Sequence, residues 1–399
     1  MAGIYVHIPF CRQACNYCNF HFSTSLKLQN DFLVALLKEI ELRRDYTAGE
    51  TIDTIYFGGG TPSLLPTAHI GRILEELRLK FTVDASAEIT LEANPDDINP
   101  GRLAEWVRLG INRLSIGVQS FFEADLRWMN RAHNAAQAMA CIPMAQDAGI
   151  RNISIDLIYG VPGMTDDNWQ TNMAKAVALG VPHLSCYALT VEPGTALDSM
   201  IRKKKVTPVN NEDQARQFLL MTDFLQKEGF DHYEISNLSR PGWKSRHNSS
   251  YWSGVSYLGL GPSAHSFNGS SRQWNIANNA LYIQALNNGG PSVEMELLND
   301  QQRFNEYLMT SVRTSEGTDL GRALLMAGPV HAPVLLKYRD EFVGKGWISA
   351  SEQRMVLTRE GKLFADHIAS EMFMNQEQKE KQKEKQKEET GTGTERIRS

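Results

Sequence analysis

Short apolar runs alternate with longer amphipathic stretches along the first half of the chain. The runs predict strands, and the stretches, whose apolar residues recur every three and four positions, predict helices. The expected strands are Ile4–Ile8, Asp53–Phe57, Glu88–Glu92, Arg113–Ile116, Asn152–Leu157 and His183–Leu189. The expected helices are Gln29–Arg43, Ala68–Leu79, Arg102–Leu109, Ala135–Asp147 and Asn168–Leu179. This alternation predicts an α/β fold in which six parallel units form a partial, open barrel.

Two further regions follow, and their patterns differ from the first. Residues 210–296 begin with a helical pattern, Asp213–Lys227, and continue into a mixed extension rich in Gly, Trp and Tyr. Residues 297–374 combine helical runs with two short strand patterns, at Gly346–Ile348 and Met355–Thr358, which favours a small winged-helix-like domain. Residues 375–399 are charged and almost free of apolar side chains, as in a solvated tail that frays into disorder. We therefore expect domain boundaries after residues 209, 296 and 374.

The predicted strands end in residues that can do chemistry, at the edge where parallel α/β folds collect their active sites. The first five endings are Cys11, Gly58–Pro62, Glu92–Pro95, Gly117–Gln119 and Asp156. Successive glycines let backbone groups approach a ligand closely, and the carboxylates of Glu92 and Asp156 can accept hydrogen bonds from an ammonium group or from ribose hydroxyls. Arg131 can bind a carboxylate bidentately, although a surface ion pair is the structural alternative for each charged residue.

Three cysteines follow the first predicted strand in the pattern C-x3-C-x2-C, at Cys11, Cys15 and Cys18. Three thiolates from one short loop can hold a [4Fe–4S] cube and leave its fourth iron open to a small molecule. Zinc is the alternative and would need His7 or His21 as a fourth ligand, but His21 lies at a spacing that common zinc frameworks do not use. The pattern therefore predicts the cluster.

Composition narrows the class of protein further. The 399 residues, 42% of them hydrophobic, suffice for a large core and an appended domain. Lysine and arginine number 41 against 46 for aspartate and glutamate, and this net charge of −5 gives no indication of nucleic-acid binding. No apolar stretch approaches the roughly 20 residues of a membrane span and no signal segment is evident, so we expect a cytoplasmic location. Cys141 and Cys186 are expected to be ordinary buried thiols.

Four segments resemble the radical S-adenosylmethionine (SAM) enzymes of the HemN/HemW branch, and the resemblance covers residues 1 to about 374. They are Tyr5–Cys11, Gly58–Pro62, Asn112–Gln119 and Asp156–Pro162. The resemblance implies that the amino and carboxylate groups of SAM bind the open iron and that an electron from the cluster cleaves the sulfonium. It also implies the residues around SAM, namely Tyr5, Tyr17, Gly59, Gly60, Thr61, Glu92, Gln119, Arg131, Asp156 and, as a weaker match, Thr190.

Within this branch the sequence favours the heme chaperones over the oxygen-independent coproporphyrinogen III oxidases. The oxidases resemble C-x3-C-x2-C-x-C and carry a longer N-terminal extension, whereas here Phe20 occupies the fourth cysteine position and ten residues precede Cys11. The stretch from His247 to Trp252 matches the H-N-x-x-Y-W of the HemW-type chaperones. An imidazole can bind heme iron axially while neighbouring aromatic rings cover the macrocycle. An edge strand with a half-buried aromatic pair is the structural alternative.

The resemblance implies heme binding by His247, Asn248, Tyr251 and Trp252, with His247 as the preferred axial ligand and His265 as the second candidate. We expect a protein that binds the cluster, SAM and heme and transfers heme to an acceptor protein, for which a membrane-bound respiratory enzyme is one candidate. A low-potential electron donor is implied, and a homodimer and the cleavage of SAM during transfer are left open. The alternative is an oxidase that decarboxylates coproporphyrinogen III, since a fold does not determine a function.

Overall fold

The computed structural model describes residues 1–291 and 293–375, and the chain forms two compact units. The first unit spans residues 1–297, and the second begins at residue 298. The predicted charged tail lies outside the described residues, apart from its first position. The predicted boundaries after residues 209, 296 and 374 stay predictions.

Six parallel strands form the centre of the first unit, in their order along the chain. They are β1 (Ala2–Ile8), β2 (Ile52–Gly59), β3 (Val83–Ala93), β4 (Arg113–Gln119), β5 (Asn152–Tyr159) and β6 (His183–Ala188). The helices that connect or follow them are α1 (Gln29–Leu42), α2 (Thr67–Lys80), α3 (Pro100–Leu109), α4 (Glu123–Trp128), α5 (Ala135–Asp147), α6 (Asp166–Ala178) and α7 (Ala196–Arg202). The α/β prediction is confirmed, and each of the six expected strands is present.

The segment after residue 209 extends this sheet at both edges. Helix α8 (Asn211–Lys227) precedes β7 (Asp231–Glu234) and β8 (Asn237–Ser239), and β8 pairs antiparallel with β6. At the other edge β9 (Tyr257–Leu260) pairs parallel with β1. Three further antiparallel strands, β10 (His265–Phe267), β11 (Ser271–Asn275) and β12 (Val293–Leu297), complete a sheet of twelve strands, and α10 (Asn279–Asn287) lies between the last two.

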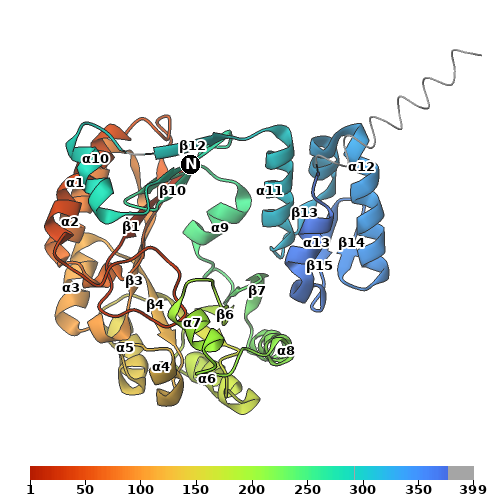
Figure 1. Ribbon diagram of the computed structural model, residues 1–399, viewed down its shortest axis with the longest axis horizontal. Coiled ribbons are helices and arrows are strands. Elements are labelled where there is room, and N and C mark those ends of the chain that lie inside the picture. Colours follow the sequence, from red (N-terminus) through yellow and green to blue (C-terminus); the bar gives the residue numbers. More distant parts are fainter. Residues whose placement is uncertain (292, 376–399) are drawn as a thin grey trace, which may run out of the picture. The chain divides into compact units, whose positions relative to one another are not determined.

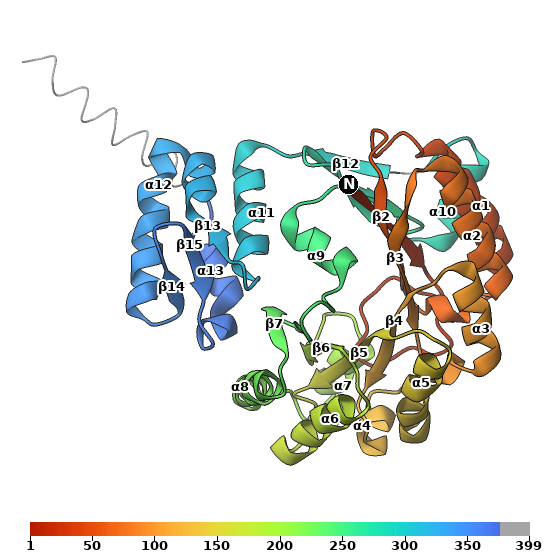
Figure 2. The same ribbon diagram turned by 180° about the vertical axis from the view of Figure 1, so that it is seen from behind.

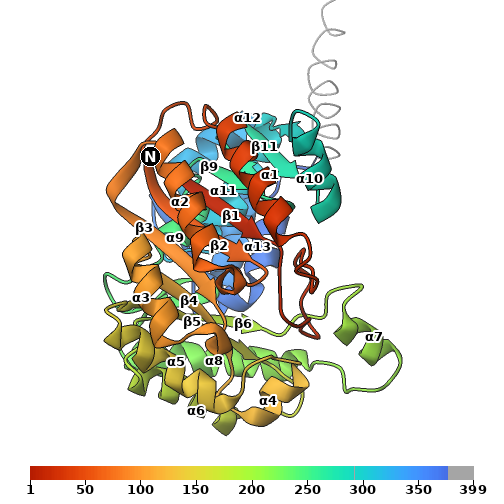
Figure 3. The ribbon, with the colours of Figure 1, turned by 90° about the vertical axis from the view of Figure 1, so that its left-hand side faces the viewer.

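The helices α1, α2 and α3 cover one face of this sheet, and α9 (Arg246–Ser253) lies on the other (Figures 1 and 2). Seen from the helical side, the connecting helices follow one another around the strands (Figure 3). Because side chains alternate along a strand, Ile4, Val6 and Ile8 of β1 point towards the helices, and all three are fully buried. Tyr5 and His7 point to the face that carries α9, so this face of the sheet is lined with polar groups.

Helix α9 contains the H-N-x-x-Y-W stretch, which is therefore a helix and not an edge strand. The side chain of Ser245 caps it by accepting a hydrogen bond from the Asn248 amide at 3.3 Å. Gly254 ends it in the left-handed conformation with φ of 69°. Serine before a helix and glycine after it are the residue types that favour such ends.

The second unit combines helices with a small antiparallel sheet, as expected for residues 297–374. Its elements are α11 (Asp300–Val312), β13 (Thr318–Asp319), α12 (Leu320–Gly344), β14 (Ile348–Ala350), β15 (Arg354–Leu357) and α13 (Ala365–Glu371). The strands pair in the order β13-β15-β14. Helix α12 is interrupted at Gly328, just before a proline, since Pro329 disfavours the helical conformation of the residue that precedes it. Across the described residues of both units, none of the helices is long and apolar enough to cross a membrane.

Candidate functional site

The three cysteines lie in the loop between β1 and α1, at the carboxyl end of the first parallel strand. Cys11 is buried, and Cys15 and Cys18 are partly exposed. Backbone hydrogen bonds close the base of this loop: the Cys11 amide donates to the Ser23 carbonyl at 3.0 Å, and the Ser23 amide donates to the Pro9 carbonyl at 2.9 Å. One fixed segment therefore presents all three thiols.

Arg131 joins the cysteine loop to the ends of two strands. Its Nη1 lies 3.2 Å from Cys15 Sγ, and its Nη2 donates to Asn94 Oδ1 at 2.7 Å and to the Gly117 carbonyl at 2.8 Å. Tyr17 also interacts electrostatically with this guanidinium. A fixed cation at this position stabilises the ionised form of a neighbouring thiol.

The thiols need such compensation, because burial raises the pKa of Cys11 to about 11 and also raises the pKa of Cys18. The Thr61 hydroxyl donates to Cys11 Sγ at 3.5 Å, which acts in the opposite direction. Among the described residues, no group of three or more His, Cys, Asp or Glu side chains is arranged to hold a metal ion. The donor chemistry, three soft thiols beside the Arg131 cation, fits an iron–sulfur cluster, whose ligands are thiolates.

Two glycines at the end of β2 stand where a side chain would collide with its surroundings. Gly59 has a φ of +104°, and its amide donates to Glu92 Oε2 at 3.1 Å. A Cβ at Gly60 would lie 2.7 Å from the Phe10 carbonyl oxygen and 2.8 Å from that of Ile8. The glycines therefore bring the backbone of β2 against the cysteine loop, where the Gly60 amide donates to the Ile8 carbonyl at 2.9 Å and the Thr61 amide to the Phe10 carbonyl at 2.7 Å.

Two carboxyl groups point into the same region, Glu92 from β3 and Asp156 from β5. Burial raises the pKa of Glu92 to about 7 and that of Asp156 to about 6. Glu92 accepts a hydrogen bond from the Tyr56 hydroxyl at 2.7 Å, and Asp156 is the register partner of Ser185 in the β5–β6 pair. Because these surroundings disfavour the ionised carboxylate, a ligand with an ammonium group would gain by restoring it.

Gln119 ends β4 in a left-handed conformation, with φ of +65°, which residues other than glycine seldom adopt. The pairing of β4 with β5 is irregular between Ile116 and Gln119. A Cβ at Gly117 would lie 3.0 Å from Arg131 Nη2 and 3.0 Å from Gln119 Nε2, so two polar side chains converge on this glycine. Backbone strain of this kind persists where the surrounding structure fixes it, and it clusters at binding sites.

The structure brings most of the predicted SAM residues together at one edge of the sheet. Contacts already given connect Tyr17, Gly59, Gly60, Thr61, Glu92, Gln119 and Arg131 to the strand ends or to the cysteine loop. Tyr5 and Asp156 join them through their electrostatic interactions with Glu92. Thr190 differs, since it follows β6 with an exposed side chain. The roles of these residues towards SAM stay predictions.

Three further residues belong to this region, and the sequence reasoning gave none of them a place beside the SAM residues. Asn94 binds Arg131 and also donates from Nδ2 to Thr61 Oγ1 at 3.3 Å. Tyr56 holds Glu92, and His7 Nδ1 is hydrogen-bonded to the Tyr5 hydroxyl at 3.1 Å. Their signal is positional: Asn94 follows a strand directly, and Tyr56 lies two positions before Gly58, on the same face of its strand.

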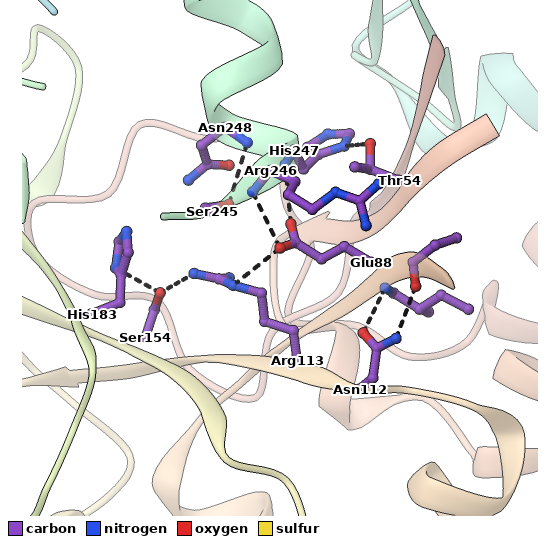
Figure 4. A network of polar contacts seen from close by, with 12 residues as sticks. Thr54, Glu88, Asn112, Arg113, Ser154, His183, Ser245, Arg246, His247 and Asn248 are labelled. Carbon is purple, nitrogen blue, oxygen red and sulfur yellow. Dashed lines mark hydrogen bonds and ion pairs between the residues drawn. The ribbon is translucent and has the colours of Figure 1, made fainter. Parts of the chain in front are cut away.

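Figure 4 shows His247 and Asn248 of the predicted heme segment beside Thr54 of β2 and Glu88 of β3. His247 is 1% exposed, and both of its ring nitrogens have partners: Nδ1 is 2.7 Å from Thr54 Oγ1, and Nε2 is 2.8 Å from the Tyr251 hydroxyl. Burial lowers the pKa of His247 to about 3, so its ring is neutral. Asn248 and Trp252 are partly exposed on the same helix. Iron ligation by His247 stays a prediction, and it would require one of these two hydrogen bonds to break.

His265, the second candidate ligand, has a different environment. It lies on β10 with an exposed side chain, and its ring stacks on Trp274 with the centroids 6.0 Å apart. Trp274 is its partner across the antiparallel β10–β11 pair. Burial on one side lowers the pKa of His265 from its ordinary value, which favours the neutral form that binds a metal.

Comparison with known proteins agrees with this arrangement. The pattern of the Radical SAM superfamily matches residues 5–176, which span the cysteine loop and β1 to β5. The heme chaperone HemW of Mycobacterium tuberculosis is 35% identical over 371 residues, which cover 92% of this chain and 93% of that protein. The HemW proteins of Bacillus subtilis and Escherichia coli are each 30% identical to this chain. The matches cover 92% and 93% of this chain, respectively, and 98% of each relative. The chain belongs to the HemW family.

The chain therefore also belongs to the radical SAM superfamily, and this membership implies a [4Fe–4S] cluster and SAM. The fold also resembles that of the coproporphyrinogen III oxidase HemN of Escherichia coli, a radical SAM enzyme. The TM-score is 0.79 at 25% identity, and the match covers 94% of this chain and 90% of HemN. The α/β radical SAM fold predicted from the sequence is therefore confirmed.

Proposed function

We propose that this HemW chain binds a [4Fe–4S] cluster, SAM and heme, and that it transfers heme to an acceptor protein. The observation that carries the first half of the proposal is the Arg131 side chain, which bonds Cys15 on one side and the ends of β3 and β4 on the other. The heme half is supported by the relatives named heme chaperone over nearly the whole of both chains. A cytoplasmic location belongs to the same proposal.

Each part of the site has a defined task in this proposal. Cys11, Cys15 and Cys18 hold the cluster, which when bound supplies the electron for SAM chemistry. The carboxyls of Glu92 and Asp156 orient the polar groups of SAM, and the Gly59 amide holds Glu92 in place. Arg131 holds the cysteine loop against the ends of β3 and β4, and its positive charge offsets the negative charge of the thiolates.

Heme is held in this proposal by one of two histidines. The α9 segment with His247, Asn248, Tyr251 and Trp252 is the one that the family resemblance predicts, and His265 is the second candidate. Of the two imidazoles, that of His265 is exposed, whereas that of His247 is buried between Thr54 and Tyr251. A planar macrocycle reaches an exposed ring on a strand more readily than a buried one, so geometry favours His265.

An oxygen-independent coproporphyrinogen III oxidase is the second candidate function, and the likeness to HemN favours it. Phe20 weighs against it, because this residue stands where the oxidase pattern has a fourth cysteine. The Phe20 side chain is 66% exposed, so the position is open and holds no thiol. A heme-acceptor protein and a low-potential electron donor are the partners that the chaperone proposal requires.

One anaerobic preparation tests the two functions side by side. The reconstituted, reduced protein is titrated with heme and followed by its Soret band. A second portion is incubated with SAM and coproporphyrinogen III, and protoporphyrinogen and carbon dioxide are measured. The chaperone proposal expects stoichiometric heme binding and no conversion; conversion over many turnovers would replace it with the oxidase.

A further inference from the structure

Helix α9 closes the end of the parallel strands that lies opposite the cysteine loop. The residues that meet it come from the amino-terminal parts of the strands: Thr54 from β2, Glu88 from β3 and Arg113 from β4. At Gly3 of β1 a Cβ would lie 3.4 Å from the His247 ring, so the helix packs directly on the strand. We call this layer the barrel floor, defined by Thr54, Glu88, Arg113, Ser154, His183 and His247 (Figure 4).

The floor is a buried network of paired polar groups. Glu88 accepts hydrogen bonds from the backbone amides of Arg246, at 3.1 Å, and of His247, at 3.0 Å, and its Oε2 lies 3.8 Å from Arg113 Nε. Arg113 donates to Ser154, and Ser154 Oγ lies 2.7 Å from His183 Nδ1. Arg113 is 1% exposed and Glu88 4%, so this ion pair is held away from water. Arg113 Nε and Nη1 have no hydrogen-bond partner among the described residues, so Glu88 holds this guanidinium by charge.

From the floor, stacked rings lead along the polar face of the sheet towards the SAM residues. The His247 ring stacks on Tyr56 with the centroids 5.0 Å apart and the planes at 21°, and Tyr56 stacks on Tyr5 at 6.1 Å. The Tyr56 hydroxyl then donates to Glu92, which accepts the Gly59 amide. Two contacts therefore separate His247 from the Glu92 carboxylate.

We propose that His247 is a positioning residue for the SAM site, which it supports from the barrel floor through the Tyr56 ring and Glu92. The Thr54 and Tyr251 hydroxyls fix the orientation of the His247 imidazole. The Tyr56 ring stacks on this imidazole, so its position is fixed as well. The inference rests on the part of the proposed function that places SAM beside Glu92. It assigns the H-N-x-x-Y-W histidine to the support of the SAM site and leaves the heme iron to another ligand.

The test measures SAM affinity by calorimetry on the anaerobically reconstituted full chain. His247→Ala removes the ring, and Thr54→Val removes one hydrogen bond while it keeps the shape of the side chain. We expect the SAM dissociation constant to rise about tenfold in His247→Ala, which loses two buried hydrogen bonds. In Thr54→Val, which loses one, we expect a rise of about threefold. Ser253→Ala is the control on the same helix, because its exposed hydroxyl bonds only the Ser249 carbonyl.

A double-mutant cycle separates positioning from general loss of stability. If His247 acts through Tyr56, the double variant His247→Ala, Tyr56→Phe should bind SAM no more weakly than the weaker-binding single variant. If the two residues act independently, the increases in the SAM dissociation constant should multiply. If His247→Ala does not fold, Thr54→Val and Tyr56→Phe form the cycle instead. Unchanged SAM affinity in the folded variants, or multiplying effects, would overturn the inference.

The heme arm of the same experiment keeps this inference distinct from the proposed function. Each variant is titrated with heme, and we expect His247→Ala to keep the Soret band of the unaltered protein. Loss of that band with unchanged SAM affinity would make His247 the heme ligand and reject the inference. Failure of the unaltered protein to bind heme would instead reject the chaperone proposal, while the SAM measurements would still decide the role of His247.

Discussion

The two ends of the parallel strands carry glutamates in contrasting environments: Glu88 is buried and Glu92 is partly exposed. Glu88, at the barrel floor, faces the Arg113 guanidinium and two backbone amides of α9. Glu92 lies four residues further along the same strand, and the hydrogen bonds it accepts come from the Tyr56 hydroxyl and the Gly59 amide, both uncharged. Since residues rise by about 3.3 Å each along a strand, the two carboxyls are separated by roughly 13 Å of β3.

This difference distinguishes a structural end from a binding end. At the floor the protein itself supplies the charge opposite to Arg113, so this ion pair needs no ligand. At the other end lie a carboxyl with a pKa raised to about 7 and a guanidinium beside a thiol. A ligand with an ammonium group would stabilise the ionised carboxylate, and a ligand with a carboxylate group would stabilise the guanidinium.

The largest expected effect is at the binding end, where the cluster depends on three thiolates. Replacing Cys11, Cys15 or Cys18 by Ala should abolish bound iron and sulfide, because two thiolates do not hold the cube against water and oxygen. Iron and sulfide analysis after anaerobic reconstitution measures this. Cys141→Ala and Cys186→Ala serve as controls, since both thiols are buried in the core as predicted, and should keep the cluster. Full cluster content in any variant of the first three would refute the ligand assignment.

The same substitution at the two glutamates should have opposite consequences. Glu88→Gln leaves Arg113 buried without its counter-charge, and we expect it to destabilise the first unit by about 3 kcal/mol. Glu92→Gln removes a carboxyl that is costly to ionise, so the apoprotein should be as stable as the parent or more stable at neutral pH. Thermal unfolding followed by the fluorescence of the buried Trp106 and Trp169 measures both. Equal destabilisation by the two changes would contradict the distinction between the ends.

A third prediction concerns the ligand rather than the fold. Gly59→Val adds a branched side chain at a φ of +104°, where a Cβ would lie 2.4 Å from the His7 ring, and Asp156→Ala removes one of the two carboxyls. Each should weaken SAM binding about tenfold or more, as measured by calorimetry, while the cluster survives.

Gly149→Val is the matched control for the glycine change, because Gly149 also has a positive φ, of +95°, and its added Cβ would meet nothing within 4 Å. It carries the backbone strain of the change and lies outside the site. If SAM affinity stayed the same in both Gly59→Val and Asp156→Ala, the proposed pocket would be wrong.

The sequence predicts the binding end far better than the floor. The cysteine loop, Gly58–Pro62 and Glu92 stand in short local patterns at strand ends, and parallel strands bring such ends to one edge. The floor has no local signature, because its contacts join residues that are far apart: Thr54 meets His247 across 193 residues, and Arg246 meets Glu88 across 158. The H-N-x-x-Y-W stretch was therefore assigned by resemblance, with no indication that a helix buries its histidine.

The smallest expected effect is a loss of stability with rising pH, to which Glu92 at the binding end contributes. The pKa of Glu92 is about 7 in the folded protein against an ordinary value of 4.5, so between these values the folded state binds more protons than the unfolded state. Stability therefore falls as the pH rises through this range, and Glu92 should account for roughly 1 to 2 kcal/mol of the loss between about pH 5 and pH 7.5.

The difference between the parent and Glu92→Gln isolates this contribution, since both keep the buried histidines. His7 and His247 have pKa values lowered to about 4 and about 3, so they act with the opposite sign and reduce stability as the pH falls below the ordinary histidine range. We expect the gap between the melting temperatures of the two apoproteins to widen from pH 5 to pH 7.5, with Glu92→Gln the more stable. Added SAM on the reconstituted protein should close the gap, because its ammonium group pairs with the ionised Glu92 and has no such partner in the variant. A gap that does not vary with pH would show that Glu92 keeps an ordinary pKa and would remove the electrostatic basis for the ligand-binding end.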